Sequence, residues 1–168
     1  MQAQFIKGTS EDRIVIRGAG HATAELRFPK KGVIPHDAVH LVVEQELRME
    51  TGFWGQIAAG TDPDEVADKA RNGGHASAKR PGDPAPEIVE LVQAERVVEC
   101  FEAEMWSAPA SHEVFVGVLE AACAQSKVPP PAVTSEQIER VRATLAEVRE
   151  QWEPLPIGGS ISLDWNPG

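Results

Sequence analysis

The sequence predicts an α+β domain in which a small antiparallel sheet packs on a bundle of about four helices. Residues up to 28 alternate apolar and polar side chains as strands do, the middle of the chain repeats apolar residues at helical spacing, and residues 160–165 alternate again. This last segment has no strand-like neighbour in sequence. We therefore expect it to join the N-terminal strands in one sheet, with one face packed on the helices.

Length and composition indicate one soluble-type domain. The chain has 168 residues, of which 42% are hydrophobic and 25% charged, and its formal net charge is -10. A general nucleic-acid binder needs an excess of Lys and Arg to neutralise phosphates, and an anionic membrane surface attracts the same residues. No apolar run approaches the roughly 20 residues of a membrane span, and no signal peptide is visible. We therefore expect a single domain over residues 1–168 in a bacterial cytoplasm, without nucleic-acid or membrane partners.

Three N-terminal strands are predicted, over residues 4–7, 13–17 and 22–28. Glycines at positions 18 and 20 mark a turn between the last two, and residues 29–32 end the segment. In residues 22–28 one face is apolar and the other polar, as expected for a meander with one solvated side.

A helix is predicted over residues 35–51. Pro35 fits the first helical position, where a missing N–H is not needed, and Gly52 is a typical C-terminal stop. The sequence Gly-Phe-Trp-Gly over residues 52–55 then predicts a tight chain reversal whose rings fill the core. An exposed aromatic recognition loop is the alternative. The apolar side of the helix consists of Val39, Val42, Val43 and Leu47.

The second half of the chain predicts mostly helix. A short helix begins at Asp62, and residues 71–85 form a long mobile loop within the same domain. Three further helices cover residues 86–106, 111–127 and 134–153, the last with a capping box at its start. The acidic residues of helix 86–106, which we expect mostly on its outer face, are Glu87, Glu90, Glu95, Glu99 and Glu102.

The two cysteines sit in apolar helical patterns. Cys100 and Cys123 are expected to be buried free thiols, with a disulfide as the less favoured alternative. The chain has no Cys-x-x-Cys pair, which excludes a structural zinc site made of thiolates.

The most specific chemical signal lies in helix 35–51, where His36, His40 and Glu44 follow one another at four-residue intervals. Residues at this spacing share one helix face, so two imidazoles and a carboxylate converge as ligands of a divalent metal. Asp37 either orients a ligating histidine or is a ligand itself. The predicted metal site is therefore His36, Asp37, His40 and Glu44, with zinc or manganese as the ion.

Each of these residues also has an ordinary structural explanation. Asp37 stabilises the helix N-terminus as any first-turn carboxylate does, and His40 pairs with Glu44 as a common helical contact. The positive end of the helix dipole disfavours a charged His36. We therefore expect its imidazole to be neutral, which is the form that binds metal.

A second group of residues surrounds two consecutive glycines. Arg71, His75, Lys79 and Arg80 form a basic island in an otherwise acidic chain. A glycine-rich backbone flanked by cations can hold an anion, although the Gly-Lys-Ser/Thr ending of a P-loop is missing. These residues are predicted either to bind an anion and close over His36 as a lid, or to be a solvated loop.

Two resemblances follow from these motifs. Residues 35–40, with Glu44, Leu47 and the turn at 52–55, resemble a family of uncharacterised small bacterial proteins, as do residues 155–160. This resemblance covers most of the chain and implies no known activity.

The five residues from His36 to His40 are also similar to the zinc motif of the coenzyme Q biosynthesis protein of the fourth complementation group. In that family a glutamate stands twelve positions after the second histidine. The corresponding residue here is Gly52, so Glu44, Glu46, Glu50 or a ligand from elsewhere must complete the site.

Two functions remain open at this point. A three-ligand metal site with an open position makes a nucleophile of bound water, which implies a hydrolase-type or lyase-type metalloenzyme acting on an unknown small molecule. The alternative is a non-enzymatic interaction domain with structural histidines. In that case helix 86–106 and the pair Phe53-Trp54 contact a protein partner.

Overall fold

The computed structural model describes residues 1–18, 23–73 and 82–167 and confirms the α+β class. In the described chain, a four-stranded antiparallel sheet of order β3-β2-β1-β4 packs against the helices. The strands are β1 (Gln2–Ile6), β2 (Glu11–Arg17), β3 (Ala24–Pro29) and β4 (Ser160–Asp164). The helices are α1 (His36–Leu47), α2 (Phe53–Ala58), α3 (Pro63–Gly73), the 3₁₀ turn η2 (Pro86–Ile88), α4 (Val89–Glu104), α5 (His112–Gln125) and α6 (Ser135–Trp152).

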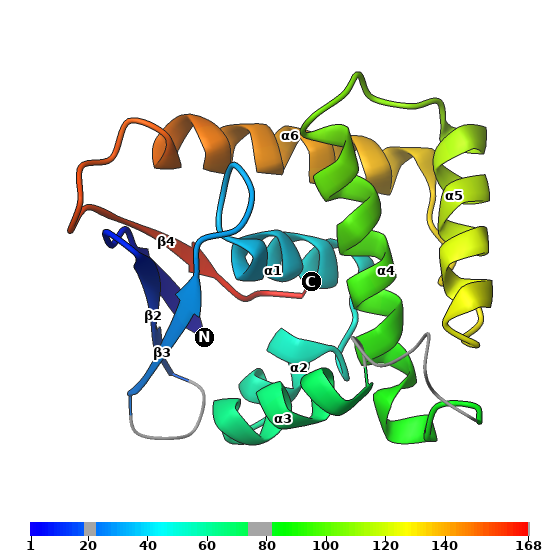
Figure 1. The fold of residues 1–168 in the computed structure, drawn as a ribbon, viewed down its shortest axis with the longest axis horizontal. Helices are drawn as coiled ribbons and strands as arrows, with labels where there is room; N and C mark the ends of the chain where they lie inside the picture. Colours follow the sequence, from blue (N-terminus) through cyan, green and yellow to red (C-terminus); the bar gives the residue numbers. More distant parts are fainter. Residues whose placement is uncertain (19–22, 74–81, 168) are drawn as a thin grey trace.

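The C-terminal strand joins the N-terminal strands as predicted. β4 pairs antiparallel with β1, so Phe5 lies opposite Ile161 and Ala3 opposite Leu163 (Figure 1). The side chains of Ala3 and Phe5 are fully buried because β1 has a strand on each side and helices over its inner face. The two ends of the chain therefore hold each other in place through one sheet.

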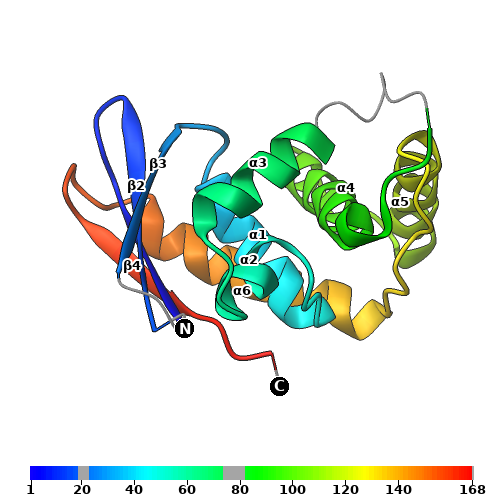
Figure 2. The same ribbon diagram turned by 90° about the horizontal axis from the view of Figure 1, so that it is seen from below.

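Helix α1 lies at the centre of the molecule. Figure 1 shows it between the sheet and α4, with α6 running along one side, and Figure 2 shows α2 and α3 on a further side. As a result seven consecutive residues of α1, from Ala38 to Glu44, are buried. Val39, Val42 and Val43 of the predicted apolar stripe belong to this buried surface, whereas Leu47 is half-buried. The polar residues His40 and Glu44 are buried with the valines.

The bounds of α1 differ from those predicted. Pro35 is the N-cap rather than the first helical residue, and the helix ends at Leu47 rather than near residue 51. Arg48 adopts a left-handed conformation with φ 54°, which lets the N–H of Met49 bond to the carbonyl of Glu44. This early stop turns the buried Met49 back against the core and places α2 beside α1.

The Gly-Phe-Trp-Gly sequence forms the start of the short helix α2 rather than a simple chain reversal. Trp54 is fully buried, and its ring meets the edge of Phe5 with 6.1 Å between centroids. The predicted filling of the core is confirmed for Trp54, whereas Phe53 is half-buried and packs against the core. The alternative of an exposed recognition loop is wrong. Both glycines are required by close packing, since a Cβ at Gly55 would collide with the carbonyl of Glu50.

The later helices follow the predicted pattern with small shifts. The helix predicted over residues 86–106 begins as η2 and continues as α4. Thr134 and Gln137 form the predicted capping box of α6. α3 continues through Gly73, so the beginning of the predicted loop 71–85 is helical. Cys100 and Cys123 are buried free thiols, and burial raises the pKa of each to about 11. Among the described residues, no helix is long and apolar enough to cross a membrane.

Candidate metal centre

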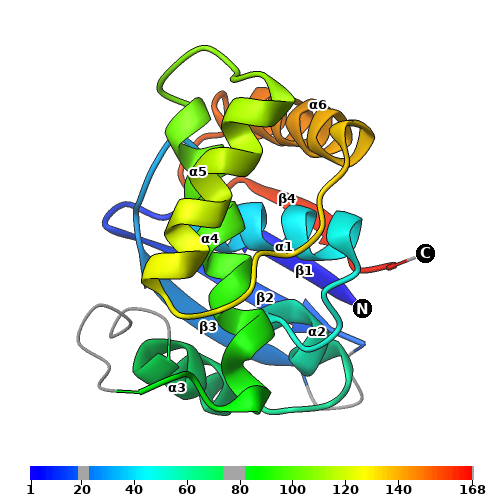
Figure 3. The same ribbon diagram turned by 90° about the vertical axis from the view of Figure 1, so that its right-hand side faces the viewer.

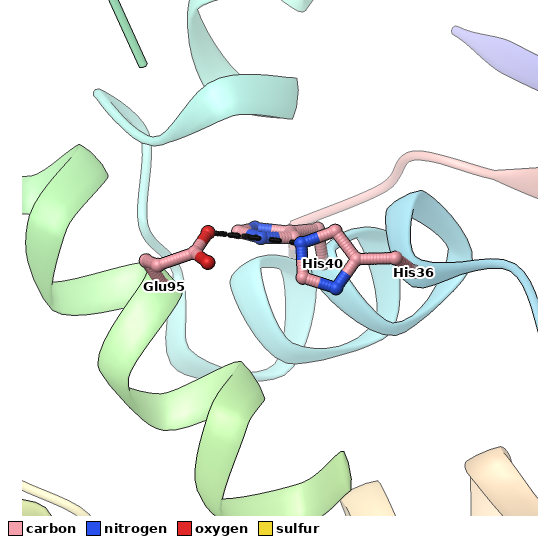
Figure 4. A group of neighbouring side chains, drawn as sticks. All are labelled: His36, His40 and Glu95. Carbon is pink, nitrogen blue, oxygen red and sulfur yellow. Dashed lines mark hydrogen bonds and ion pairs between the residues drawn. The ribbon is translucent and has the colours of Figure 1, made fainter. Parts of the chain in front are cut away.

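The two histidines of α1 point together at one carboxylate of α4. His36 and His40 lie one turn apart at the start of α1, and Glu95 faces them from α4 (Figure 4). Glu95 Oε2 is 3.1 Å from Nε2 of His40 and 3.7 Å from Nε2 of His36. The imidazole rings meet edge to face, with 4.7 Å between their centroids.

The other nitrogen of each imidazole is held by a second carboxylate. Nδ1 of His36 is 2.8 Å from Oε1 of Glu102, and Nδ1 of His40 is 3.0 Å from Oε1 of Glu44. The N–H at each Nδ1 donates to its carboxylate. Nε2, which faces Glu95, is therefore the nitrogen that can bind a metal ion once its own proton is lost. Carboxylates that orient histidines in this way commonly surround metal ions in proteins.

Glu95 is the member of this group that the sequence did not predict. It was expected mostly on the outer face of its helix, as was Glu102, but their side chains are only 15% and 28% exposed. Both lie on the face of α4 that meets α1, because residues seven apart in a helix return to the same side. A signal was present in the sequence, since Leu91, Glu95, Val98 and Glu102 follow the 4-3-4 spacing of one buried stripe.

Glu44 contacts Nδ1 of His40, on the side of the imidazole ring away from Glu95. Its side chain is fully buried, and its Oε2 accepts a hydrogen bond of 2.8 Å from the backbone N–H of Trp54. This position depends on Gly52, where a Cβ would stand 2.5 Å from Oε2 of Glu44. Glu44 therefore orients His40 from the Nδ1 side, while Glu95 meets the Nε2 side.

Asp37 lines the same cavity as the histidines. Its backbone carbonyl accepts a hydrogen bond of 2.8 Å from Nε1 of Trp54, which anchors the start of α1 on α2. Burial raises the pKa of the Asp37 carboxyl, against the opposing effect of the two histidines. Asp37 is thus a carboxylate next to the site, outside the group of atoms that converge on Glu95.

The carboxylates control the charge of the imidazoles. Burial alone would lower the pKa of both histidines, but the hydrogen bonds that His36 donates to Glu102 and Glu95 raise its pKa to about 9. The hydrogen bonds that His40 donates to Glu44 and Glu95 likewise raise its pKa to about 10. Burial would raise the pKa of Glu95, but hydrogen bonds from both histidines outweigh it and lower that pKa well below its usual range. The expectation of a neutral His36 is therefore wrong for the metal-free protein, because the nearby carboxylates outweigh the effect of burial.

The geometry of these three side chains fits a metal ion. One ligand atom each from His36, His40 and Glu95 lie within 4.8 Å of one another. Ligand atoms about 2.0–2.1 Å from a tetrahedral zinc ion are separated by roughly 3.3 Å. The distances of 3.1 and 3.7 Å to Glu95 bracket this value, and the two imidazole nitrogens lie within 4.8 Å of each other. Within the described part of the chain, this group can hold a metal ion.

A cavity of about 410 Å³ opens in front of the site. Its walls come from β2, β3 and helices α1 to α4. Its volume is large enough for a small ligand. Arg71 lines it from α3 and forms an ion pair with Asp68. Of the predicted anion-binding group, Arg71 thus reaches the cavity of His36, while His75, Lys79 and Arg80 lie outside the described residues.

Comparisons of this chain with protein-family models, with curated proteins and with solved structures find no match. The resemblances drawn from residues 35–40 and their surroundings stay predictions, and function has to be inferred from the site itself.

Proposed function

We propose that this protein binds a divalent metal ion, zinc in preference to manganese, through His36, His40 and Glu95, and that the ion activates water for catalysis. The observation that supports this most is that each imidazole has one carboxylate at Nε2 and another at Nδ1. Two imidazoles and one carboxylate form a set found in catalytic zinc sites, where a fourth position is left for water.

The surroundings of the site support catalysis over a purely structural ion. The three ligands face a cavity instead of a closed core, so a water molecule and a substrate can both approach the metal. Bound hydroxide is a nucleophile for hydrolase-type chemistry and a base for lyase-type chemistry. Asp37, which lines the cavity, would accept a proton from water activated by the ion, and Arg71 would contact an anionic group of the substrate.

The metal is tested with chelator-treated protein that carries no histidine tag. Adding zinc should raise the melting temperature, since an ion that binds only the folded state stabilises it by mass action. The shift should disappear in His40→Ala and Glu95→Gln. His112→Ala is the matched control, because His112 bonds to the carbonyl of Val133 and belongs to no metal-binding group among the described residues. Equal responses of wild type and His40→Ala to zinc and manganese would refute the proposal.

A second candidate is the interaction domain, and a different surface supports it. Trp106, Val114 and Val118 are 74%, 57% and 54% exposed, and they lie after α4 and on α5, the helix farthest from the sheet. Exposed apolar groups of this size are typical of protein contacts. Loss of self-association or partner binding in Val118→Lys, with the metal response intact, would show that this surface acts independently of the site.

A further inference from the structure

The cavity in front of the candidate metal centre runs along the free edge of strand β3. Five consecutive residues of this strand, 25–29, line the cavity. Alternate side chains of a strand point to opposite faces of a sheet, so a cavity that touches all five reaches from the inner face, where it also touches Ile14, to the strand edge. β2 occupies the opposite edge, and β3 is the last strand in the sheet order of the described chain.

Helix α3 forms the wall opposite this edge. Asp64, Ala67 and Arg71 line the cavity at intervals of three and four residues, which places them on one face of α3. Figure 3 shows β3 and α3 side by side at one end of the molecule. The histidines and Glu95 lie along the same cavity. The result is a groove bounded by a strand edge and a helix, with the candidate metal centre inside it.

We propose that this groove binds an extended peptide as an added strand on β3. Every second residue of an edge strand directs its N–H and C=O groups outward, and an extended peptide satisfies these groups while its alternate side chains enter pockets. The half-buried Leu26 and Phe28, together with Phe53, provide apolar walls for such side chains. The six residues of β3 span about 20 Å, which matches a peptide of about six residues.

A second copy of the chain fits this edge less well than a peptide does. Antiparallel pairing of two β3 strands would bring the exposed Arg27 near the middle of the strand close to its counterpart, and like charges that face each other are destabilising. Pro29 at the end of the strand lacks an N–H for such a pairing. α3 also stands beside the edge, where a second sheet would have to lie.

The peptide is the substrate only if the proposed metal function holds, whereas its binding to β3 is independent of that function. In the hydrolysis of a peptide, the oxygen of water bonds to the carbonyl carbon, the C–N bond breaks, and a proton moves to the leaving nitrogen. The products are a carboxylate and an amine, and no electron donor or acceptor is needed. The groove would hold the reacting carbonyl near His36, His40 and Glu95.

The test uses an equimolar library of N-acetylated hexapeptide amides and the full-length protein, both zinc-loaded and chelator-treated. Binding should slow hydrogen exchange at alternate backbone amides of β3. The tightest hexapeptide is then resynthesised with N-methyl groups at alternate positions. Methylation of one alternate set should weaken binding at least tenfold, and methylation of the other set should have little effect. Ala67→Trp should also weaken binding by filling the groove, with Glu65→Trp on the exposed side of α3 as the matched control.

The outcomes separate the two proposals. If zinc stabilises the protein but no hexapeptide protects β3 at millimolar concentration, the peptide inference is wrong and the metal function stands. If both methylated peptides bind as well as the parent, strand addition is wrong. If β3 is protected without peptide and the protein is a dimer, the edge belongs to a second copy. If peptides bind β3 and no metal binds, the groove is correct and the metal function is wrong.

Discussion

Replacing Gly52 by alanine should damage the metal centre without touching a ligand. Gly52 has φ -67° and ψ -171°, a backbone conformation open to any residue, so the effect of the substitution is purely steric. The new Cβ would lie 2.5 Å from Oε2 and 2.7 Å from Cδ of Glu44. The buried carboxylate must move away, since the backbone around Gly52 is packed between α1 and α2.

The cost of this movement follows from the partners of Glu44. Its carboxylate holds Nδ1 of His40 at 3.0 Å and accepts the N–H of Trp54 at 2.8 Å. Hydrogen bonds to charged groups contribute about 1.5–3 kcal/mol each, so loss of both at the low end costs about 3 kcal/mol. In a domain of this size each kcal/mol lowers the melting temperature by about 2–4 °C, which gives a fall of about 6–12 °C.

Thermal melts and zinc titrations test this together. Losing a carboxylate that orients a ligating histidine typically weakens metal affinity about 10–100-fold, so Gly52→Ala should bind zinc more weakly in that range. Gly117→Ala is the matched control, because a Cβ there meets nothing within 4 Å on the exposed side of α5. That change should raise stability by about 0.5–1 kcal/mol through helix propensity. If Gly52→Ala melts within about 1 °C of wild type, far less than the expected fall, and also binds zinc equally well, the assigned role of Glu44 is refuted.

Three further predictions concern the site and the sheet. Glu102→Gln should lower zinc affinity about 10–100-fold while the protein stays folded, because His36 loses its charged partner. Calorimetric titration measures the affinity, and an unchanged value would contradict the role of Glu102. Because the folded pKa values of His36 and His40 are raised to about 9 and 10, their stabilisation of the metal-free protein is complete below pH 6.5 and lost as the pH rises through 9–10. Zinc affinity should rise over the same window as protons cease to compete, and a pH-independent affinity from 6.5 to 9 would count against the assigned ligands. Deleting β4 and the residues after it removes the buried Ile161 and Trp165. The free energy of unfolding should then fall by several kcal/mol, at about 1.5–3 kcal/mol per side chain. A truncated chain that melts like the intact one would show that β4 is peripheral.

Much of the fold follows from local patterns in the sequence. Strands and helices were predicted near their observed positions, because alternation and helical spacing identify the buried face of each element. The pairing of β4 with β1 was also predicted, since an apolar strand at the end of the chain needs a partner. The bounds of α1 were missed because its end at Arg48 depends on how α2 packs against it.

For the candidate site, the sequence by itself determined that His36 and His40 share one face at the start of a helix, with Asp37 beside them. Only the tertiary structure decided that Glu95 meets both imidazoles and that Glu44 and Glu102 hold their other nitrogens. The physical reason is the range of the forces involved. Backbone geometry relates residues within a few turns of one helix, whereas the contact between α1 and α4 depends on the packing of the whole core, and no local spacing specifies it.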